Sequence, residues 1–234
     1  MFINVLVGLI GIWSIYTIIP TIYYKYIHKT KYKRGHLDLT FDDGPNPETT
    51  PQILEILNKN NKIATFFIVG EKALENPEIV KEAYNKGHKI GIHCYNHTHP
   101  LFWGPLKTKR DMEKSLEVFK KLEIIPSYYR PPHGFVNLSM IYLFNSWKLP
   151  LKLWTNIPGD WKDNKDWEEI YREIKREKIK GGIICLHDSN HKISTKTKAN
   201  ENTIKALEKY FKETRIKWKM KKEKETIKEN TIKT

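Results

Sequence analysis

Between His36 and Lys212 the sequence alternates short apolar runs with segments of helical periodicity, and this alternation constrains the fold more than any other feature. Short apolar runs bounded by Gly, Pro or polar residues are typical of buried strands. The predicted strands are Leu37–Phe41, Ala64–Val69, Lys89–His93, Ser127–Arg130, Leu151–Trp154 and Ile183–His187. The predicted helices are Thr49–Asn60, Pro77–Lys86, Thr108–Leu122, Leu138–Trp147, Asp166–Lys178 and Thr203–Lys212. Alternating strands and helices with short connections predict parallel βα units, and so many units favour a barrel-like closure over an open sheet.

The first predicted strand ends in two adjacent carboxylates. The run L-D-L-T-F-D-D-G-P from Leu37 to Pro45 alternates apolar side chains and then stops at Gly44-Pro45. Asp42 and Asp43 therefore lie at the carboxyl end of a strand, the edge where α/β folds gather their chemistry. Because neighbouring strand residues point opposite ways, one carboxylate can hold a cation while the other moves a proton. A solvated Asp-Asp-Gly-Pro turn is the alternative on these residues alone.

Two histidines follow the third predicted strand, in I-G-I-H-C-Y-N-H-T-H-P. The four-residue spacing of His93 and His97 recurs among metal ligands. Together with an acid from another strand end, the pair gives an Asp-His-His set with open positions, as a catalytic metal needs. His99 is a third histidine nearby. Surface histidines at this spacing are common, which is the alternative.

Three further strand ends carry polar residues. The run Arg130-Pro131-Pro132-His133-Gly134 is a loop fixed by two prolines and a glycine, and it can present backbone N–H groups or the arginine. Asp160 stands beside Trp161, an aromatic on which a sugar can stack. His187 ends an apolar strand, where an imidazole suits a proton donor. A rigid turn, a core Trp and a structural His are the alternatives.

Residues 1–24 contain no charged side chain. As a helix, a stretch of this length can cross a hydrocarbon core of about 30 Å. A positive leading segment and a small-x-small cleavage site are both missing, so the pattern predicts an uncleaved single-pass membrane anchor. A buried amphipathic helix is the alternative. Residues 25–35 form a basic juxtamembrane linker. By the positive-inside rule, this linker would place the following domain in the cytoplasm.

The formal charge of +14 indicates association with an anionic surface such as a membrane or a cell-wall polymer. No nucleic-acid-binding motif appears, so we expect no nucleic-acid partner, and the sequence indicates no oligomeric state. Cys94 and Cys185 lie in apolar runs and are predicted to be free buried thiols. Residues 213–234 are rich in Lys, Glu and Thr, which predicts a solvated or disordered tail. Within this tail, Arg215–Met220 could form a last edge strand.

Taken in order, T-F-D-D-G-P, H-x3-H, R-P-P-x-G, D-W and L-H-D resemble the five motifs of the polysaccharide deacetylases, the carbohydrate esterase family 4 or NodB-type domain. The resemblance covers about Leu37 to Lys212. It implies a catalytic domain over residues 36–212 with a distorted (β/α)7 barrel fold, and this domain follows the single transmembrane helix that the composition of residues 1–24 predicts. The roles implied are a general base (Asp42) oriented by Arg130, metal ligands (Asp43, His93, His97), a general acid (His187) tuned by Asp160, and substrate or oxyanion groups (Pro132, His133, Gly134, with Trp161 beside them).

The resemblance further implies a divalent metal, most often zinc in this family, with Co2+, Mn2+ and Ni2+ as alternatives. It implies removal of N-acetyl groups from amino sugars of a polysaccharide such as peptidoglycan or a chitin-like glycan. Such a substrate lies outside the cytoplasmic membrane, so we expect an extracytoplasmic domain, in conflict with the positive-inside rule. The alternatives are an O-acetyl esterase, a catalytically silent membrane-tethered glycan-binding module and a metal phosphoesterase.

The sequence departs from the family pattern at three places. Cys94 stands where the family usually has Ser or Thr after the first metal histidine, which removes a hydroxyl donor and is expected to weaken a contact that supports the metal ligands. Thr98 and His99 separate the second histidine from the proline that usually follows it. His133 replaces a common aromatic in the R-P-P-x-G loop, which implies an altered acetate pocket. None of these departures removes a predicted catalytic residue.

Overall fold

The computed structural model describes residues 2–28, 32–189 and 197–232, and a parallel five-stranded sheet forms the centre of these residues. β1, β2 and β5 are buried along nearly their whole length, as expected for parallel strands that are covered on both faces. The predicted α/β class is therefore confirmed. The strands, in the spatial order β4-β3-β2-β1-β5, are β1 (Leu37–Asp42), β2 (Thr65–Val69), β3 (Lys89–Cys94), β4 (Tyr128–Tyr129) and β5 (Gly182–His187).

The register of the sheet aligns the polar residues at the strand ends. Asp42, the last residue of β1, pairs with Phe67 of β2 on one side and with His187 of β5 on the other. His93 is the penultimate residue of β3. Because all of these strands are parallel, their carboxyl ends meet at one edge, and the polar side chains gather there.

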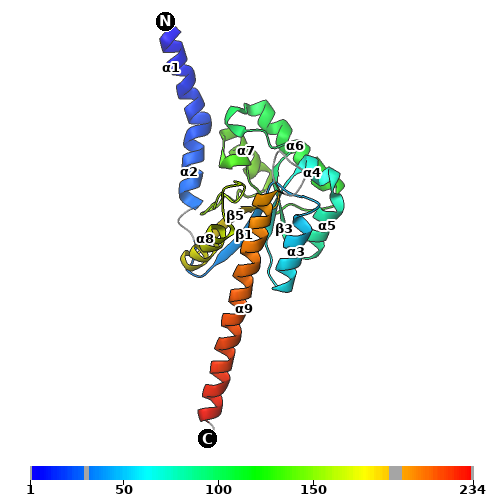
Figure 1. Cartoon of the computed structure of the whole chain (residues 1–234). Coiled ribbons are helices and arrows are strands. Elements are labelled where there is room, and N and C mark those ends of the chain that lie inside the picture. The colour runs from blue at the N-terminus through cyan, green and yellow to red at the C-terminus, as the bar shows by residue number, and fades with distance from the viewer. Residues whose placement is uncertain (1, 29–31, 190–196, 233–234) are drawn as a thin grey trace.

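Helices connect the strands and surround the sheet (Figure 1). Asn137 and Asp166 cap two of them, accepting backbone hydrogen bonds from Met140 and Glu168. The pattern did not predict α4, because six residues are too few to show an amphipathic period. The helices of this part of the chain are α3 (Thr50–Lys59), α4 (Gly70–Glu75), α5 (Pro77–Asn85), α6 (Pro105–Lys121), α7 (Leu138–Trp147) and α8 (Trp167–Lys180), with 3-10 turns at Pro100–Phe102 and Pro132–Gly134.

The predicted strand Leu151–Trp154 is not a regular strand, and the (β/α)7 barrel is not confirmed. Leu151 forms an isolated parallel bridge with Tyr129 at one edge of the sheet, and Asn156 forms another with Ile184 at the opposite edge. Cys185 donates a backbone hydrogen bond to Asn156 at 2.9 Å. This segment therefore divides its hydrogen bonds between two edges, so neither contact extends into a ladder in the described residues.

The chain begins with a long apolar helix that projects from one end of the domain (Figure 1). It comprises α1 (Phe2–Trp13), a π-helical stretch (Ser14–Ile18) and α2 (Ile19–His28). From Phe2 to Ile27 it is long and apolar enough to cross a membrane, and its most apolar 18-residue window has a mean hydropathy of 2.1. A signal sequence can have the same length and composition, so the membrane anchor predicted over 1–24 remains a proposal. Of the predicted linker, residues 29–31 lie outside the described residues.

The last helix, α9 (Lys198–Ile232), passes through the boundary expected at residues 212 and 213. Its first half packs on the domain through Leu207, Tyr210 and Phe211, which are spaced for one helical face. Beyond Glu213 the described side chains are exposed, and Lys217 pairs with Glu213 one turn away at 2.7 Å. The expected solvation of this tail is observed, but the described part is helical rather than disordered. The edge strand considered for Arg215–Met220 is wrong.

Candidate active site

A cavity of about 250 Å³ lies at the carboxyl edge of the sheet, where the predicted site residues converge. Side chains from the ends of β1, β3 and β5 form its floor, and aromatic residues from the connecting segments form its walls. Arg130 and Asp160 are buried behind this surface. The lining residues are Asp42, Asp43, His93, His97, His133, Trp154, Ile157, Trp161 and His187.

Asp42 and Arg130 form a buried ion pair under this cavity. Arg130 Nη1 lies 2.5 Å from Asp42 Oδ1, and the guanidinium has no exposed surface. The rest of the guanidinium donates to the carbonyls of Lys152 at 2.8 Å and Leu153 at 3.1 Å, and it lies 3.8 Å from the centre of the Phe67 ring. With its planar fork held on several sides, Arg130 fixes the orientation of the Asp42 carboxylate.

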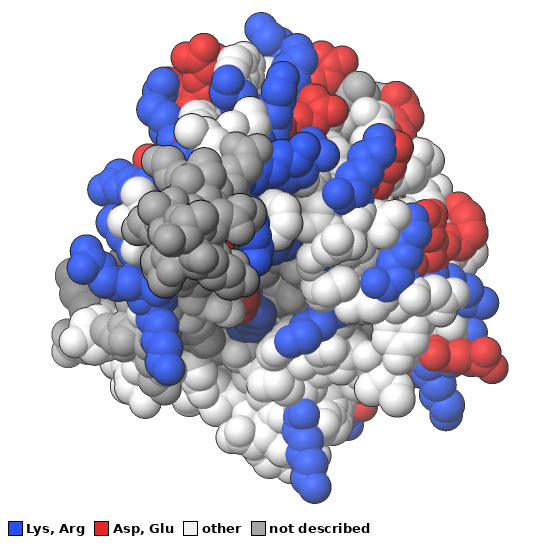
Figure 2. Space-filling model, turned by 90° about the horizontal axis from the view of Figure 1, so that it is seen from below, with Lys and Arg blue, Asp and Glu red and all other residues white. Residues whose placement is uncertain are grey.

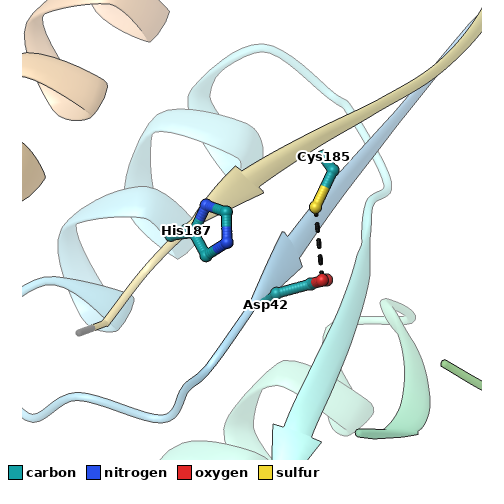
Figure 3. A group of neighbouring side chains, drawn as sticks. All are labelled: Asp42, Cys185 and His187. Atoms are coloured by element: carbon teal, nitrogen blue, oxygen red, sulfur yellow. Dashed lines mark hydrogen bonds between the residues drawn. The ribbon is translucent and has the colours of Figure 1, made fainter. Parts of the chain in front are cut away.

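A thiol holds the second oxygen of the same carboxylate. Cys185 Sγ donates to Asp42 Oδ2 at 3.2 Å, and Figure 3 shows the sulfur pointing from β5 toward Asp42 on the neighbouring strand. Burial raises the pKa of the Cys185 thiol well above its usual value, and the Asp42 charge raises it further. Cys185 therefore stays a protonated donor at neutral pH. Both oxygens of Asp42 have defined partners.

Asp43 points toward two imidazoles rather than toward Arg130. Its backbone is left-handed, with φ of 73°, which turns the side chain away from that of Asp42. Asp43 Oδ1 lies 3.3 Å from His93 Nε2 and 2.9 Å from His97 Nε2. Burial raises the pKa of the Asp43 carboxyl, but the contacts with His93 and His97 outweigh it and hold the pKa well below its usual range. The carboxylate is therefore ionised.

The donor atoms of Asp43, His93 and His97 fit a metal ion. They lie within 4.8 Å of one another and are almost fully buried. His93 Nδ1 lies 2.7 Å from the carbonyl oxygen of Arg130, which can only accept, so Nδ1 carries the proton and Nε2 presents its lone pair. One carboxylate and two imidazoles also match the ligands of catalytic zinc sites that leave positions open.

Cys94 has a role that we did not expect from its comparison with the Ser or Thr usual at this position in the family. His97 donates its backbone N–H to Cys94 Sγ at 3.0 Å, closing the turn that carries His97 with φ of 51°. The thiol thus replaces a hydroxyl as an acceptor, and it supports a metal-ligand candidate rather than weakening it. Both Cys94 and Cys185 are free and buried, as predicted.

His187 and Asp160 form a second acid–imidazole pair across the cavity. Asp160 Oδ1 lies 2.9 Å from His187 Nδ1, and Asp160 Oδ2 accepts from the His187 backbone N–H at 2.8 Å and from the Thr203 hydroxyl at 2.9 Å. Burial lowers the pKa of His187, but the Asp160 carboxylate outweighs burial and raises it to about 9. The imidazole is therefore protonated at neutral pH, with Nε2 left to face the cavity.

The R-P-P-H-G loop reaches the cavity through His133 alone. His133 has φ of 55°, its ring stacks on His99 at 4.4 Å, and it lies 5.3 Å from His97. His99 is not among the converging metal-ligand candidates of the described residues. Pro132 and Gly134 are buried and are not among the residues that line the cavity. Trp161, 38% exposed, sits at the rim with its ring 4.9 Å from His187.

The sequence motifs did not predict two buried or half-buried side chains beside the site, those of Lys72 and Asp188. Lys72 donates to the Asp43 carbonyl at 2.8 Å and to Ser189 Oγ at 2.7 Å, which ties the ends of β1 and β5 together. Asp188 accepts from the Thr50 hydroxyl at 2.6 Å, and burial raises its pKa to about 7. A side chain at Gly44 would clash with Asp188, since a Cβ there would lie 2.2 Å from Oδ2. The L-H-D motif contained the signal for Asp188, but nothing in the sequence pointed to Lys72.

Carboxylates and imidazoles gathered around one cavity at the carboxyl edge of a parallel sheet are the groups that acid–base and metal-assisted hydrolysis use. The sequence profile of the polysaccharide deacetylases matches residues 29–151. A peptidoglycan-N-acetylglucosamine deacetylase of Bacillus cereus is 32% identical over 173 residues, 73% of this chain and 81% of that enzyme. The chain therefore belongs to the polysaccharide deacetylase family, and it is a hydrolase of that class.

Other relatives widen this comparison. The peptidoglycan-N-acetylmuramic acid deacetylase PdaC of Bacillus subtilis is 33% identical over 158 residues, but the match covers only 32% of that longer protein. A crystal structure of the peptidoglycan N-acetylglucosamine deacetylase Bc1960 superposes with a TM-score of 0.70 at 29% identity, covering 80% of this chain and 85% of that one. The family 4 carbohydrate esterase of Streptomyces lividans, at 24% identity and a TM-score of 0.66, shares the fold; the match covers 78% of this chain and 88% of that one.

Proposed function

We propose that this protein is a metal-dependent deacetylase that removes N-acetyl groups from the amino sugars of a polysaccharide. One observation carries the proposal: a single cavity is lined by an oriented carboxylate, a converging Asp-His-His cluster and a protonated imidazole. Amide hydrolysis needs an activated water, polarisation of the carbonyl and a proton for the leaving nitrogen. The three groups supply one requirement each.

Asp42 acts as the general base. Its carboxylate is held by Arg130 and Cys185, and it takes a proton from the water that attacks the acetyl carbonyl carbon. His187 acts as the general acid. It gives a proton to the sugar nitrogen as the C–N bond breaks, so that acetate and a free amine leave. Asp160 keeps His187 protonated until that step.

Asp43, His93 and His97 would hold a divalent metal, and zinc suits this ligand set best. When bound, the metal supplies Lewis-acid polarisation of the acetyl carbonyl. The residues behind the ligands fix their geometry: the Arg130 carbonyl orients His93, and Cys94 supports the turn of His97. The acetate pocket would be shaped by Pro132, His133 and Gly134. At the mouth of the cavity, Trp161 would stack on a sugar ring.

Peptidoglycan is the substrate that the relatives favour, with chitin-like oligosaccharide as the second choice, since other relatives are chitooligosaccharide deacetylases. The test measures acetate release from peptidoglycan, chitooligosaccharide and acetyl-xylan with protein of known metal content. Activity on the first two that Asp42→Ala and His187→Ala abolish would support the proposal. Release from acetyl-xylan alone would favour an O-acetyl esterase. Release of no acetate by a protein without stoichiometric metal would favour a silent glycan-binding module.

The N-terminal helix serves as a single-pass anchor in this proposal. Residues 1–24 cross the membrane, residues 25–35 link the anchor to a catalytic domain over 36–212, and residues 213–234 form the tail. A wall-like substrate places the domain outside the cytoplasmic membrane, although the basic linker favours the inside. A topology reporter fused after Thr234 tests the side, and cytoplasmic reporter activity would contradict a cell-wall substrate.

A further inference from the structure

The proposed anchor helix packs directly against the catalytic domain. Tyr16 donates its hydroxyl to Ser139 Oγ at 2.9 Å. Thr21 Oγ1 donates to the Val136 carbonyl at 3.0 Å and accepts from the Val136 N–H at 2.9 Å, and the Thr21 side chain is buried. The helix is thus fixed to the start of α7 before the basic linker begins.

The part of the helix that is clear of the domain is too short to cross a bilayer. Every residue from Phe2 to Ile12 is exposed, whereas Thr17 is fully buried against the domain. Eleven helical residues span about 16 Å at 1.5 Å per residue, and the hydrocarbon core is about 30 Å thick. A spanning helix must therefore include residues to about Thr21, which already touch the domain. Tyr16 lies five residues before Thr21, so its partner Ser139 lies about 8 Å inside the edge of the hydrocarbon core, within the roughly 5–10 Å to which an interfacial helix buries its apolar face.

The surface around Ser139 is uncharged and apolar, as a surface in contact with a bilayer must be. No residue of α7, Leu138 to Trp147, carries a charge. On its outer face Leu138 is 46% exposed and Tyr142 is 71% exposed. Phe102, at the end of the neighbouring 3-10 turn, and Leu106, at the start of α6, are 75% and 72% exposed. We call these four side chains, Phe102, Leu106, Leu138 and Tyr142, the apolar rim.

The two parts of the apolar rim are held together by Asn137. Its side-chain amide donates to the Thr108 hydroxyl at 3.0 Å and to the Trp103 carbonyl at 3.5 Å, which joins the start of α7 to the start of α6. α7 lies at the end of the domain from which α1 projects (Figure 1). Seen from below, the opposite face of the molecule is crowded with Lys and Arg side chains interspersed with acids (Figure 2).

We propose that the apolar rim docks into the headgroup layer of the bilayer that the anchor crosses, so that α7 lies as an interfacial helix. The partner is the lipid surface itself, because the rim is continuous with an apolar helix and opposite a charged face. This inference rests on the proposed membrane anchor, and it holds for either side of the membrane.

Docking places the catalytic cavity at the lipid surface. The loop Pro132–Val136 joins the cavity wall to α7, and Lys25, the first charged residue after the apolar stretch, donates to the His133 carbonyl at 3.4 Å. The cavity wall thus lies level with the end of the apolar stretch. A substrate at that level is an acetylated amino sugar carried on a membrane lipid, which reaches the cavity more readily than a distant polymer.

The docking is tested with the full-length protein in phosphatidylglycerol–phosphatidylcholine vesicles. Single cysteines at Tyr142→Cys, Ile179→Cys and Gly8→Cys are labelled with a small fluorophore, since Cys94 and Cys185 are fully buried. Ile179, near the end of α8, is the matched control, because it is an apolar residue that is 65% exposed but does not belong to the apolar rim. Lipids spin-labelled near the headgroup should quench the label at 142 several-fold more than at 179. Equal quenching at 142 and 179 with strong quenching at 8 would overturn the docking and leave the anchor. No quenching at 8 would overturn the anchor, and the docking with it.

The substrate consequence is tested with the variant Leu106→Asp/Tyr142→Asp, which changes no residue that lines the cavity. With an N-acetylglucosaminyl lipid in the same vesicles, we expect a loss of about tenfold in the rate of acetate release, because two apolar contacts are lost. With soluble chitooligosaccharide the rate should stay unchanged. Unchanged rates on both substrates, or an equal loss on both, would overturn the link between docking and substrate, and a melting temperature equal to wild type excludes misfolding.

Discussion

Arg130 and Asp42 are joined by a 2.5 Å ion pair that is almost fully buried at the bottom of the cavity. Two further hydrogen bonds hold Arg130 on the carbonyls of the segment that divides its contacts between the sheet edges. The pair therefore links the β1 carboxylate to the irregular part of the fold. A charge that is this deeply buried costs several kcal/mol when it loses its partner.

The first prediction follows from this pairing. Arg130→Met should lower the free energy of unfolding by about 3–5 kcal/mol, because it leaves Asp42 buried and uncompensated. The double variant Arg130→Met/Asp42→Asn should recover part of that loss while staying inactive. Urea denaturation of the four proteins of the cycle measures both effects. If the losses of the two single variants simply added, the ion pair would carry no coupling.

A second prediction concerns Cys185 as a positioning residue. Cys185→Ala removes the donor to Asp42 Oδ2, so kcat should fall about fivefold while KM stays the same, as expected for about 1 kcal/mol of lost orientation. Cys185→Ser keeps a donor and should restore most of kcat. A merely structural role would lower the melting temperature of the Ala variant without this recovery of kcat by Ser.

The pair His187–Asp160 leads to a third prediction, on pH dependence. Asp160 raises the pKa of His187, so the protonated acid persists to higher pH than for a free imidazole. Asp160→Asn keeps a hydrogen-bond partner but removes the charge, and it should move the alkaline limb of kcat/KM to lower pH by about one unit or more. Asp163→Asn, at an exposed position in the same loop, is the control and should leave the profile in place. An unmoved alkaline limb in Asp160→Asn would show that another group titrates there.

The strands that carry the site could be predicted from sequence because each is a short apolar run that ends in a polar motif. Asp42, His93 and His187 were placed correctly at strand ends for that reason. The segment after Leu151 has the same local pattern but divides its hydrogen bonds between two sheet edges, which no local pattern encodes. The helical continuation beyond Glu213 was missed because its lysines and glutamates resemble a disordered tail in composition.

The supporting contacts of the site were less predictable than its motifs. Cys185 looked like an ordinary core thiol in an apolar run, and its contact with Asp42 arises only from the register of β1 against β5. Lys72 lies in a helix that has no motif, and it reaches Asp43 only through the packing of α4 at the end of β2. Residues that act through another residue leave little trace in one sequence, since their roles depend on tertiary contacts.

A fourth prediction tests the metal site without relying on activity. Titration of chelator-treated protein with Zn2+ should raise the melting temperature, because a ligand at 100 times its Kd stabilises the folded state by about 2.7 kcal/mol. His97→Ala should abolish most of this shift, whereas His99→Ala should preserve it, since His99 stacks on His133 outside the converging donors. Calorimetry should give one zinc per chain for wild type. A full shift in His97→Ala would place the metal elsewhere.

The last prediction concerns Asp111 of α6, which is buried and accepts a hydrogen bond from the Tyr95 N–H at 3.1 Å. Burial raises the pKa of this carboxyl to about 6 in the folded protein, above its value of about 4 in the unfolded chain. A raised pKa means that the folded state holds the proton more tightly. The stability associated with that proton is therefore complete below pH 4 and is lost as the pH rises through 6.

Asp111→Asn keeps the acceptor for Tyr95 and removes the titration. The variant should unfold at a higher temperature than wild type at pH 8, and the gain should shrink to nothing near pH 4, since both side chains are then neutral. Thermal unfolding of the two proteins across this range measures the difference. Asp163→Asn, an exposed carboxylate, should show no such pH-dependent gain. A gain for Asp111→Asn that is the same at both pH values would mean that packing, and not the buried charge, separates the two proteins.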